Sequence, residues 1–293
     1  MAARTLIDAA SVRTTLRAAG LRARHALSQN FLADPDVLSA ILDEADPAAG
    51  TRILEIGPGL GFLTRGLLDA GASVTAVELD AGLARFLNEQ LAPAIEDGSL
   101  QLLEGDALDL DLVRLLEPPY DVVANLPYHI TSPILHALLG EAPRPRRLVL
   151  MVQREVADRI AAPPGKMSYL SVFVQYHARV RVAFRVPPEA FEPEPAVESA
   201  VIVVEPYDSD DRLAPEQEDQ LWRLVQASFR ERRKMLHNVL SRQLPVEPAR
   251  VEAALKAANI DPDRRPQTLA VGEWLVLQEA LGPLPPDRRG RAS

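Results

Sequence analysis

Residues 52–61 have the sequence "RILEIGPGLG", in which a short apolar run passes directly into a loop with three glycines. The apolar run predicts a buried strand over 52–56. Gly57, Gly59 and Gly61 permit a tight turn and a close approach of the backbone to a ligand. A helix is expected directly after the loop. Strand, glycine loop and helix in this order are typical of the first unit of a doubly wound α/β sheet.

The same alternation continues along the chain and predicts a mainly parallel sheet with helices on both faces. Helices are expected over 5–20 and 35–46, ahead of the glycine loop. Ser132 before Pro133 predicts a further helix start. The later strands are expected over residues 73–78, 100–105, 120–125 and 147–152.

The pattern changes after residue 150. Alternating β-branched and aromatic residues over 169–186 predict one long strand or a bent pair, and 199–206 predicts another strand. Because no helix is expected between them, they are predicted to form an antiparallel edge of the sheet. From about residue 208 the periodicity is helical. We therefore expect a domain boundary near 208–214, a small all-α domain over 209–282 and a disordered tail over 283–293.

The composition excludes several classes of protein. The chain has 293 residues and no cysteine, which excludes a disulfide scaffold and thiolate metal sites and favours a reducing, cytoplasmic compartment. No apolar run approaches the roughly 20 residues that span a bilayer, and no secretory signal is recognised. The histidines form no pattern of metal ligands, so no metal is expected. A monomer is the simplest expectation.

The charge distribution leaves two interpretations open. The net charge of -9 by itself argues against a nucleic-acid partner. Residues 223–242, however, contain six basic residues and one acidic residue, and residues 1–30 contain five arginines and one aspartate. Such clusters can bind phosphates locally, or they can be solvated helix faces.

Acidic residues at two strand ends predict a nucleoside ligand. Glu78 ends the strand after the glycine loop, where a carboxylate can accept both hydroxyls of a ribose. The loop has the spacing G-x-G-x-G and offers no room or positive charge for a diphosphate, which favours a ligand with one ribose. Asp106 follows the next strand and can accept a hydrogen bond from the amine of adenine, or it can simply cap the following segment. The pair predicts S-adenosylmethionine as the cofactor.

The segment Asn125, Leu126, Pro127 and Tyr128 follows the strand at 120–125 and suits a nucleobase amine as methyl acceptor. Such an amine is a poor nucleophile because its lone pair is delocalised into the ring. The Asn125 side chain and the Leu126 backbone carbonyl can accept its hydrogen bonds, and Tyr128 can stack on an extruded base. Catalysis would then rest on positioning, without a strong general base. A rigid turn with a packed tyrosine is the alternative.

The motifs, in their order along the chain, resemble those of the small-subunit (16S) ribosomal RNA adenine N6,N6-dimethyltransferases, the kasugamycin-resistance dimethyltransferases. The resemblance runs from about residue 12 to 280. It implies a methyltransferase domain over 1–208, which has a Rossmann-like sheet and an N-terminal helical extension, and an rRNA-docking role for 209–282. It also implies S-adenosylmethionine-dependent dimethylation of two adjacent adenosines near the 3′ end of 16S rRNA in the small subunit or its precursor. The motifs are "QNFLAD" (29–34), "EIGPGLGFLT" (55–64), "VELD" (77–80), "GDAL" (105–108), "NLPYHITSPIL" (125–135), "VPPEAFEPEPAVESAV" (186–201) and "ASFRERRKMLHNVL" (227–240).

The resemblance also implies roles for individual residues. Phe191 is similar to the second aromatic residue that stacks on the target base, opposite Tyr128, and Asn125 is shared between cofactor and target amine. The predicted rRNA contacts are Arg230, Arg232, Arg233 and Lys234. The predicted cofactor contacts are Asn30, Leu32, Gly57, Gly59, Glu78, Asp106, Ala107 and Asn125.

Three alternatives are weighed against this function. The first is an adenine N6-methyltransferase of large-subunit rRNA, of the antibiotic-resistance type. The second is an RNA-binding assembly factor without catalysis, which the presence of Glu78, Asp106 and Asn125 does not favour. The third is a nicotinamide-dependent dehydrogenase, which the glycine spacing disfavours.

Overall fold

The structure is a computed structural model, and it describes residues 7–24, 29–127, 130–208, 213–231 and 233–285. The chain forms two compact units. The first unit comprises residues 1–158 and 177–206, and the second comprises 159–176 and 207–293. Residues 159–176, placed in the first domain by the sequence analysis, thus belong to the second unit.

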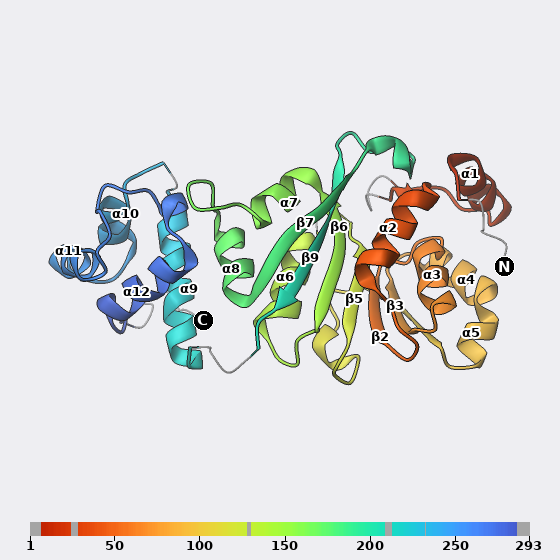
Figure 1. The fold of residues 1–293 in the computed structure, drawn as a ribbon, viewed down its shortest axis with the longest axis horizontal. Helices are drawn as coiled ribbons and strands as arrows, with labels where there is room; N and C mark the ends of the chain where they lie inside the picture. The colour runs from red at the N-terminus through yellow and green to blue at the C-terminus, as the bar shows by residue number, and fades with distance from the viewer. Residues whose placement is uncertain (1–6, 25–28, 128–129, 209–212, 232, 286–293) are drawn as a thin grey trace, which may run out of the picture. The chain divides into compact units, whose positions relative to one another are not determined.

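The first unit is built on one seven-stranded sheet with the strand order β4-β3-β2-β5-β6-β9-β7 (Figure 1). The first five of these strands are parallel, while β9 runs antiparallel to both β6 and β7. The predicted mostly parallel sheet with an antiparallel edge is confirmed. The strands are β2 (Arg52–Ile56), β3 (Ser73–Glu78), β4 (Leu100–Glu104), β5 (Asp121–Asn125), β6 (Arg147–Gln153), β7 (Ala178–Val186) and β9 (Ser199–Pro206).

The prediction of a strand over all of 169–186 is wrong in its first half. Residues Tyr169–His177 form the helix α8, and only Ala178–Val186 form the strand β7. Leu170, Phe173 and His177 are buried at helical spacing, and Val172 and Val174 between them are buried as well. A helix that is buried nearly all round has the same β-branched and aromatic composition as a buried strand, because burial overrides local propensity.

Short polar signals set the starts of several helices in the first unit. The Asp8 carboxylate accepts a hydrogen bond from the Ser11 amide at 2.6 Å, and Asp34 caps the helix that Pro35 begins. The predicted start at Ser132 is wrong, because the helix begins at Thr131 and Ser132 lies in its first turn. The helices are α1 (Ala9–Ala18), α2 (Pro35–Ala45), α3 (Phe62–Asp69), α4 (Ala81–Gln90), α5 (Ala92–Glu96), α6 (Thr131–Gly140) and α7 (Arg154–Ile160), with 3₁₀ turns at Leu112–Arg114 and Pro188–Ala190.

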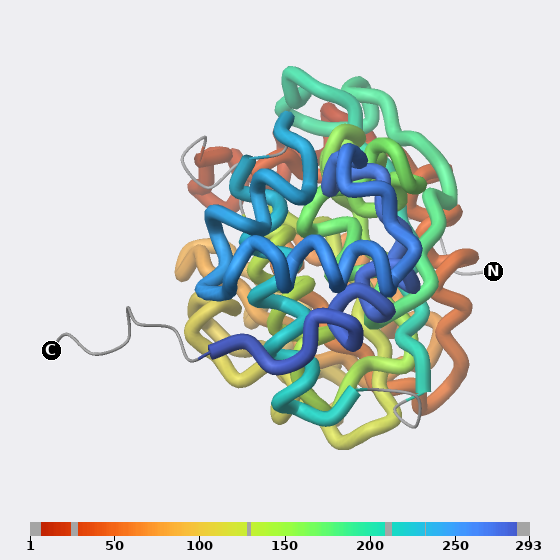
Figure 2. Tube along the Cα trace, turned by 90° about the vertical axis from the view of Figure 1, so that its left-hand side faces the viewer, coloured from red at the N-terminus to blue at the C-terminus, as the bar shows by residue number. Residues whose placement is uncertain are grey.

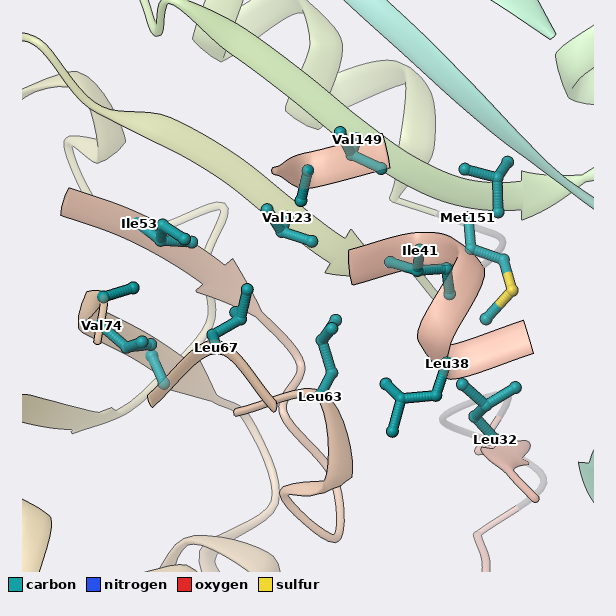
Figure 3. Close-up of a cluster of buried hydrophobic side chains, with 14 of the residues drawn as sticks. Leu32, Leu38, Ile41, Ile53, Leu63, Leu67, Val74, Val123, Val149 and Met151 are labelled. Carbon is teal, nitrogen blue, oxygen red and sulfur yellow. The ribbon is translucent and has the colours of Figure 1, made fainter. Parts of the chain in front are cut away.

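One face of the sheet is covered by α2, α3 and α4. Leu38 and Ile41 of α2 and Leu67 of α3 point towards strand residues such as Ile53 and Val123 (Figure 3). These side chains are at most 9% exposed. Removing this much apolar surface from water is the main contribution to the stability of the unit.

A second, two-stranded antiparallel sheet pairs β1 (Phe31–Leu32) with β8 (Phe191–Glu192).

The second unit is helical around a core of its own. The helices α9 (Pro215–Phe229), α10 (Leu236–Gln243), α11 (Pro248–Ala257) and α12 (Val271–Leu281) pack pairwise, α9 on α10 and α12, and α11 on the same two (Figure 2). A 3₁₀ turn (Pro266–Thr268) precedes α12. Trp274 is fully buried in this core.

The tail predicted to be disordered is in part ordered. Leu284 is buried, and the carbonyl of Pro285 accepts a hydrogen bond from Arg223 at 2.6 Å. The rest of the predicted tail, residues 286–293, lies outside the described residues.

Candidate active site

A pocket lies at the carboxyl ends of β2, β3, β4 and β5, within the first unit. The carboxyl ends of parallel strands meet at one edge of a sheet, so side chains that are far apart in the sequence converge there. The pocket has further walls from β1 and β8. Tyr128 lies outside the described residues. The predicted residues that line the pocket are Asn30, Leu32, Gly57, Gly59, Glu78, Asp106, Ala107, Asn125, Leu126, Pro127 and Phe191.

The glycine loop forms one side of the pocket with its backbone. Gly59 has φ +60°, in the left-handed region that side chains disfavour. A Cβ added to Gly59 would lie 3.2 Å from the Phe31 ring, and one on Gly61 would lie 2.7 Å from Leu87. Gly61 has φ +77°, so a side chain would be strained at both positions, and Phe31 or Leu87 would have to shift to admit it. The predicted tight turn is present.

Glu78 is held at the end of β3 by two backbone amides. Its Oε2 accepts a hydrogen bond from the Gly59 amide at 3.0 Å, and its Oε1 accepts one from the Asp80 amide at 2.9 Å. Burial raises the pKa of Glu78, and the two amide bonds oppose the rise. Each carboxylate oxygen can accept a second hydrogen bond. The group can therefore accept two adjacent hydroxyls in a fixed orientation.

Asp106 organises the turn after β4 and also lines the pocket. Its Oδ1 accepts a hydrogen bond from the Leu108 amide at 2.9 Å, and its backbone carbonyl accepts one from Asp109 at 3.0 Å. The side chain thus caps the turn, as the alternative interpretation expects, and it also lines the ligand pocket. The two roles are compatible because a carboxylate has two acceptor oxygens.

Asn125 is the last residue of β5, and its side-chain amide contacts the backbone of Asn30 in the adjoining pocket wall. The side-chain Nδ2 donates to the backbone carbonyl of Asn30 at 3.4 Å. This contact uses one of the two Nδ2 hydrogens, and the carbonyl oxygen of the same amide is an acceptor suited to a ligand that donates a hydrogen bond. The backbone that follows is fixed as well, because the Leu126 amide donates to Met151 at 3.1 Å and the Ile130 amide donates to Pro127 at 3.2 Å.

Phe191 reaches the pocket from a segment that is distant in the sequence. It lies in β8, pairs with Leu32 of β1, and is 1% exposed. The pairing places both residues in the wall of the same pocket. Arg13 of α1 forms an ion pair with Glu192 at 2.6 Å, which ties the amino-terminal helix to β8.

Sequence analysis missed Glu55, a buried acid in the pocket wall. Glu55 is 1% exposed, and its Oε2 has no hydrogen-bond partner among the described residues. Burial and the nearby Glu78 carboxylate raise the pKa of Glu55 to about 8, while Thr64 opposes the rise. The signal in the sequence is a charged residue inside the apolar strand "RILEI". Such a residue is rarely buried unless the fold makes use of it.

The predicted basic residues lie in the second unit. Arg230, Arg233 and Lys234 are exposed, and Arg232 lies outside the described residues. Glu231 in the same segment forms an ion pair with Arg242 at 2.9 Å, so part of the basic cluster is neutralised. The three described cations line a surface pocket of the helical unit together with Phe229, Glu231 and Gln267.

A family model for ribosomal RNA adenine dimethylase matches residues 20–281, which is most of the chain. The chain belongs to this family. It is a methyltransferase whose methyl donor is S-adenosylmethionine. The curated relatives carry a methyltransferase name: a ribosomal RNA small subunit methyltransferase A from Anaeromyxobacter sp. (strain K) is 43% identical over 93% of this chain and 98% of its own. One of the same name from Alkaliphilus oremlandii is 40% identical over 87% of this chain and 90% of its own.

Solved structures show the same fold for this dimethylase. A dimethyladenosine transferase from Plasmodium falciparum has a TM-score of 0.70 and 25% identity, covering 84% of this chain and 95% of its own. The 23S rRNA methyltransferase ErmE has a TM-score of 0.68 and 29% identity, covering 86% of this chain and 99% of its own. Within the described part of this dimethylase, no helix is long and apolar enough to cross a bilayer, and no cluster of acidic or histidine side chains is placed to hold a metal.

The pocket of this dimethylase fits its cofactor by two observations. The Glu78 carboxylate is buried and oriented to accept paired hydroxyls, as in a ribose. Glu55 lines the same pocket, and its buried Oε2 has no partner among the described residues, so a hydrogen-bonding group of the ligand could satisfy it.

Proposed function

We propose that the protein dimethylates the N6 amines of two adjacent adenosines near the 3′ end of 16S rRNA, in the small ribosomal subunit or its precursor. The observation that carries the proposal is the position of Asn125. It lies at the end of β5 in the same pocket as Glu78 and Asp106, so an acceptor for the target amine adjoins the nucleoside site. The small-subunit names of the curated relatives support the choice of rRNA.

The proposed cofactor site uses the strand ends and the amino-terminal wall. Glu78 accepts hydrogen bonds from the ribose hydroxyls, and Asp106 accepts one from the adenine amine. Gly57 and Gly59 let the backbone approach the ligand closely. Asn30, Leu32 and Ala107 complete the walls. When bound, the cofactor supplies an electrophilic methyl group on a sulfonium.

The proposed acceptor site positions the target amine in line with that methyl group. The two N–H groups of the amine donate hydrogen bonds to the side-chain carbonyl of Asn125 and the backbone carbonyl of Leu126. Pro127 fixes the backbone that follows these two acceptors. The Phe191 ring lies against the extruded base, with Tyr128 as the proposed second ring. The amine becomes acidic once methylated, so its proton leaves without a strong general base, and the catalytic contribution is positioning and electrostatics.

The helical unit is proposed to dock the rRNA. Arg230, Arg233 and Lys234 are exposed cations on a chain with a net charge of -9, so phosphate binding is expected to be local to this cluster. Arg232 is proposed to join them. An rRNA substrate and the absence of cysteine favour a cytoplasmic protein. We propose that it acts as a monomer.

A second candidate is methylation of an adenine in large-subunit rRNA, which the structural likeness to ErmE favours. The curated relatives with 40–44% identity carry the small-subunit name, and this higher identity favours the first candidate. Mapping methylated adenines in both rRNAs separates the two functions.

The experiment is primer extension across the 3′ end of 16S rRNA and across 23S rRNA from cells that lack the protein and are supplied with variants. The parent should restore two adjacent stops in 16S rRNA. Asn125→Ala should remove them, while Asn88→Ala, which removes an amide on α4 outside the pocket lining, should keep them. Stops in 23S rRNA only would establish the second candidate, and normal stops with Asn125→Ala would refute the acceptor assignment.

A further inference from the structure

Asp80 joins three parts of the pocket that are separate in the sequence. It follows β3 by two residues and is 4% exposed. Its backbone amide donates to Glu78 Oε1 at 2.9 Å. Its side chain contacts the start of α4, and it also contacts Arg24 and Gln29 of the amino-terminal segment, which leads into the pocket wall at residues 29–32. Neither the motifs nor the comparisons assign it a role.

The two carboxylate oxygens of Asp80 serve different partners. Oδ1 accepts hydrogen bonds from the amides of Gly82 at 2.8 Å and Leu83 at 3.3 Å, which caps α4. Oδ2 accepts a hydrogen bond from Gln29 Nε2 at 3.3 Å and forms an ion pair with Arg24 Nε at 3.2 Å. One oxygen therefore stabilises a helix start, while the other holds the amino-terminal segment.

Gln29 carries the contact into the pocket wall. Its Oε1 accepts a hydrogen bond from the Arg24 amide at 2.8 Å, so its amide group is held at both ends. Gln29 itself lines the pocket, and the next three residues do the same. Leu21 adds an apolar contact to the same region, since a Cβ on Gly82 would lie 2.8 Å from its Cδ2. The segment is thus anchored on the first turn of α4.

We propose that Asp80 is a positioning residue that couples the pocket wall at residues 29–32 to the ribose carboxylate of Glu78. A cofactor held by both elements is retained only while Asp80 Oδ2 keeps the wall in place. The proposal rests on the proposed placement of the cofactor against Glu78.

Asp80→Asn tests the coupling with almost no change of shape. The Asn Oδ1 can still cap α4, but its Nδ2 then faces Gln29 Nε2 and Arg24 Nε, so donor meets donor and the wall loses its anchor. We expect the Kd for S-adenosylmethionine to rise about tenfold, as for a lost hydrogen bond to a charged group. The KM for the cofactor should rise in parallel, while kcat at saturating cofactor stays within twofold of the parent.

Arg24→Gln provides a second variant that does not endanger folding, because the Arg24 side chain is 63% exposed. It should raise the Kd about two- to threefold. In the double variant the effect should equal that of Asp80→Asn alone, because both act on one contact. Arg114→Gln is the matched control: it removes an exposed Arg–Asp pair of 3.1 Å outside the pocket and should leave the Kd unchanged.

Hydrogen exchange of peptides covering residues 29–33 distinguishes positioning from general damage. The cofactor should protect these amides from exchange in the parent and protect them far less in Asp80→Asn. The amides of β6 serve as the reference and should be equally protected in both proteins. A Kd within twofold of the parent for a folded Asp80→Asn protein overturns the proposal. If Glu78→Gln also leaves the Kd unchanged, the placement of the cofactor fails; if only Asp80→Asn does so, the coupling alone fails.

Discussion

Glu55→Gln should stabilise the ligand-free protein increasingly as the pH rises. The folded state raises the pKa of Glu55 to about 8 from an ordinary value of 4.5, because the carboxyl is buried beside Glu78. Between these two values the unfolded chain loses the proton and the folded protein keeps it. In this range the folded state binds more protons than the unfolded chain, so the free energy of unfolding falls as the pH rises.

The size of the effect follows from the two pKa values. Each pH unit between 4.5 and about 8 removes roughly 1.4 kcal/mol from the free energy of unfolding. The accumulated loss is at most about 5 kcal/mol at pH 8. Glutamine is of similar shape and has no proton to lose, so the variant avoids this loss. Above pH 8 both states of the parent are ionised, and the difference should level off.

The measurement is urea unfolding of parent and variant, followed by circular dichroism at pH 5, 6, 7 and 8 without ligand. Subtracting the two proteins at each pH cancels the titration of all other groups that the substitution leaves alone. Glu104→Gln, at the exposed end of β4, is the matched control and should track the parent. A Glu55→Gln advantage that stays constant from pH 5 to 8 would refute the reasoning, since Glu55 would then ionise alike in both states.

Three further outcomes are expected. Gly59→Ala should destabilise the protein by about 1–2 kcal/mol and weaken cofactor binding in calorimetry, because φ is +60° and the new Cβ meets the Phe31 ring; unaltered binding would mean that the loop tolerates a side chain. Trp274→Ala should lower the free energy of unfolding by about 3–5 kcal/mol in denaturant titrations, because it empties the core of the helical unit, and a loss below 1 kcal/mol would contradict that burial. Arg233→Gln with Lys234→Gln should weaken rRNA binding and lower the salt dependence of log K by roughly 2, and an unchanged slope would place the rRNA elsewhere.

Much of the sheet could be predicted from local pattern alone. The predicted strands 52–56, 73–78 and 199–206 coincide with β2, β3 and β9, because each is an apolar run bounded by turn residues. The site residues at strand ends could be predicted for a related reason. Parallel strands bring their carboxyl ends to one edge of the sheet, so residues that end different strands in the sequence lie close together in the structure.

Other features could not be obtained from local pattern. The helix over 169–177 was mistaken for a strand because apolar composition does not distinguish two fully buried elements, and residues 159–176 join the second unit although their sequence neighbours lie in the first. Sequence pattern also gave no reason to place Leu32 beside Phe191, whose contact depends on pairing between two-residue strands.

The sequence by itself determined the alternation of strands and helices, the glycine loop and the acidic strand ends, because these depend on spacing along a few residues. Only the tertiary structure decided how the pocket is closed and how its acids titrate. The amino-terminal segment is held by Asp80 across some fifty residues, and burial together with the Glu78 carboxylate raises the pKa of Glu55. Both effects depend on what the folded chain brings within a few ångströms, and such proximity is not written in any single stretch of sequence.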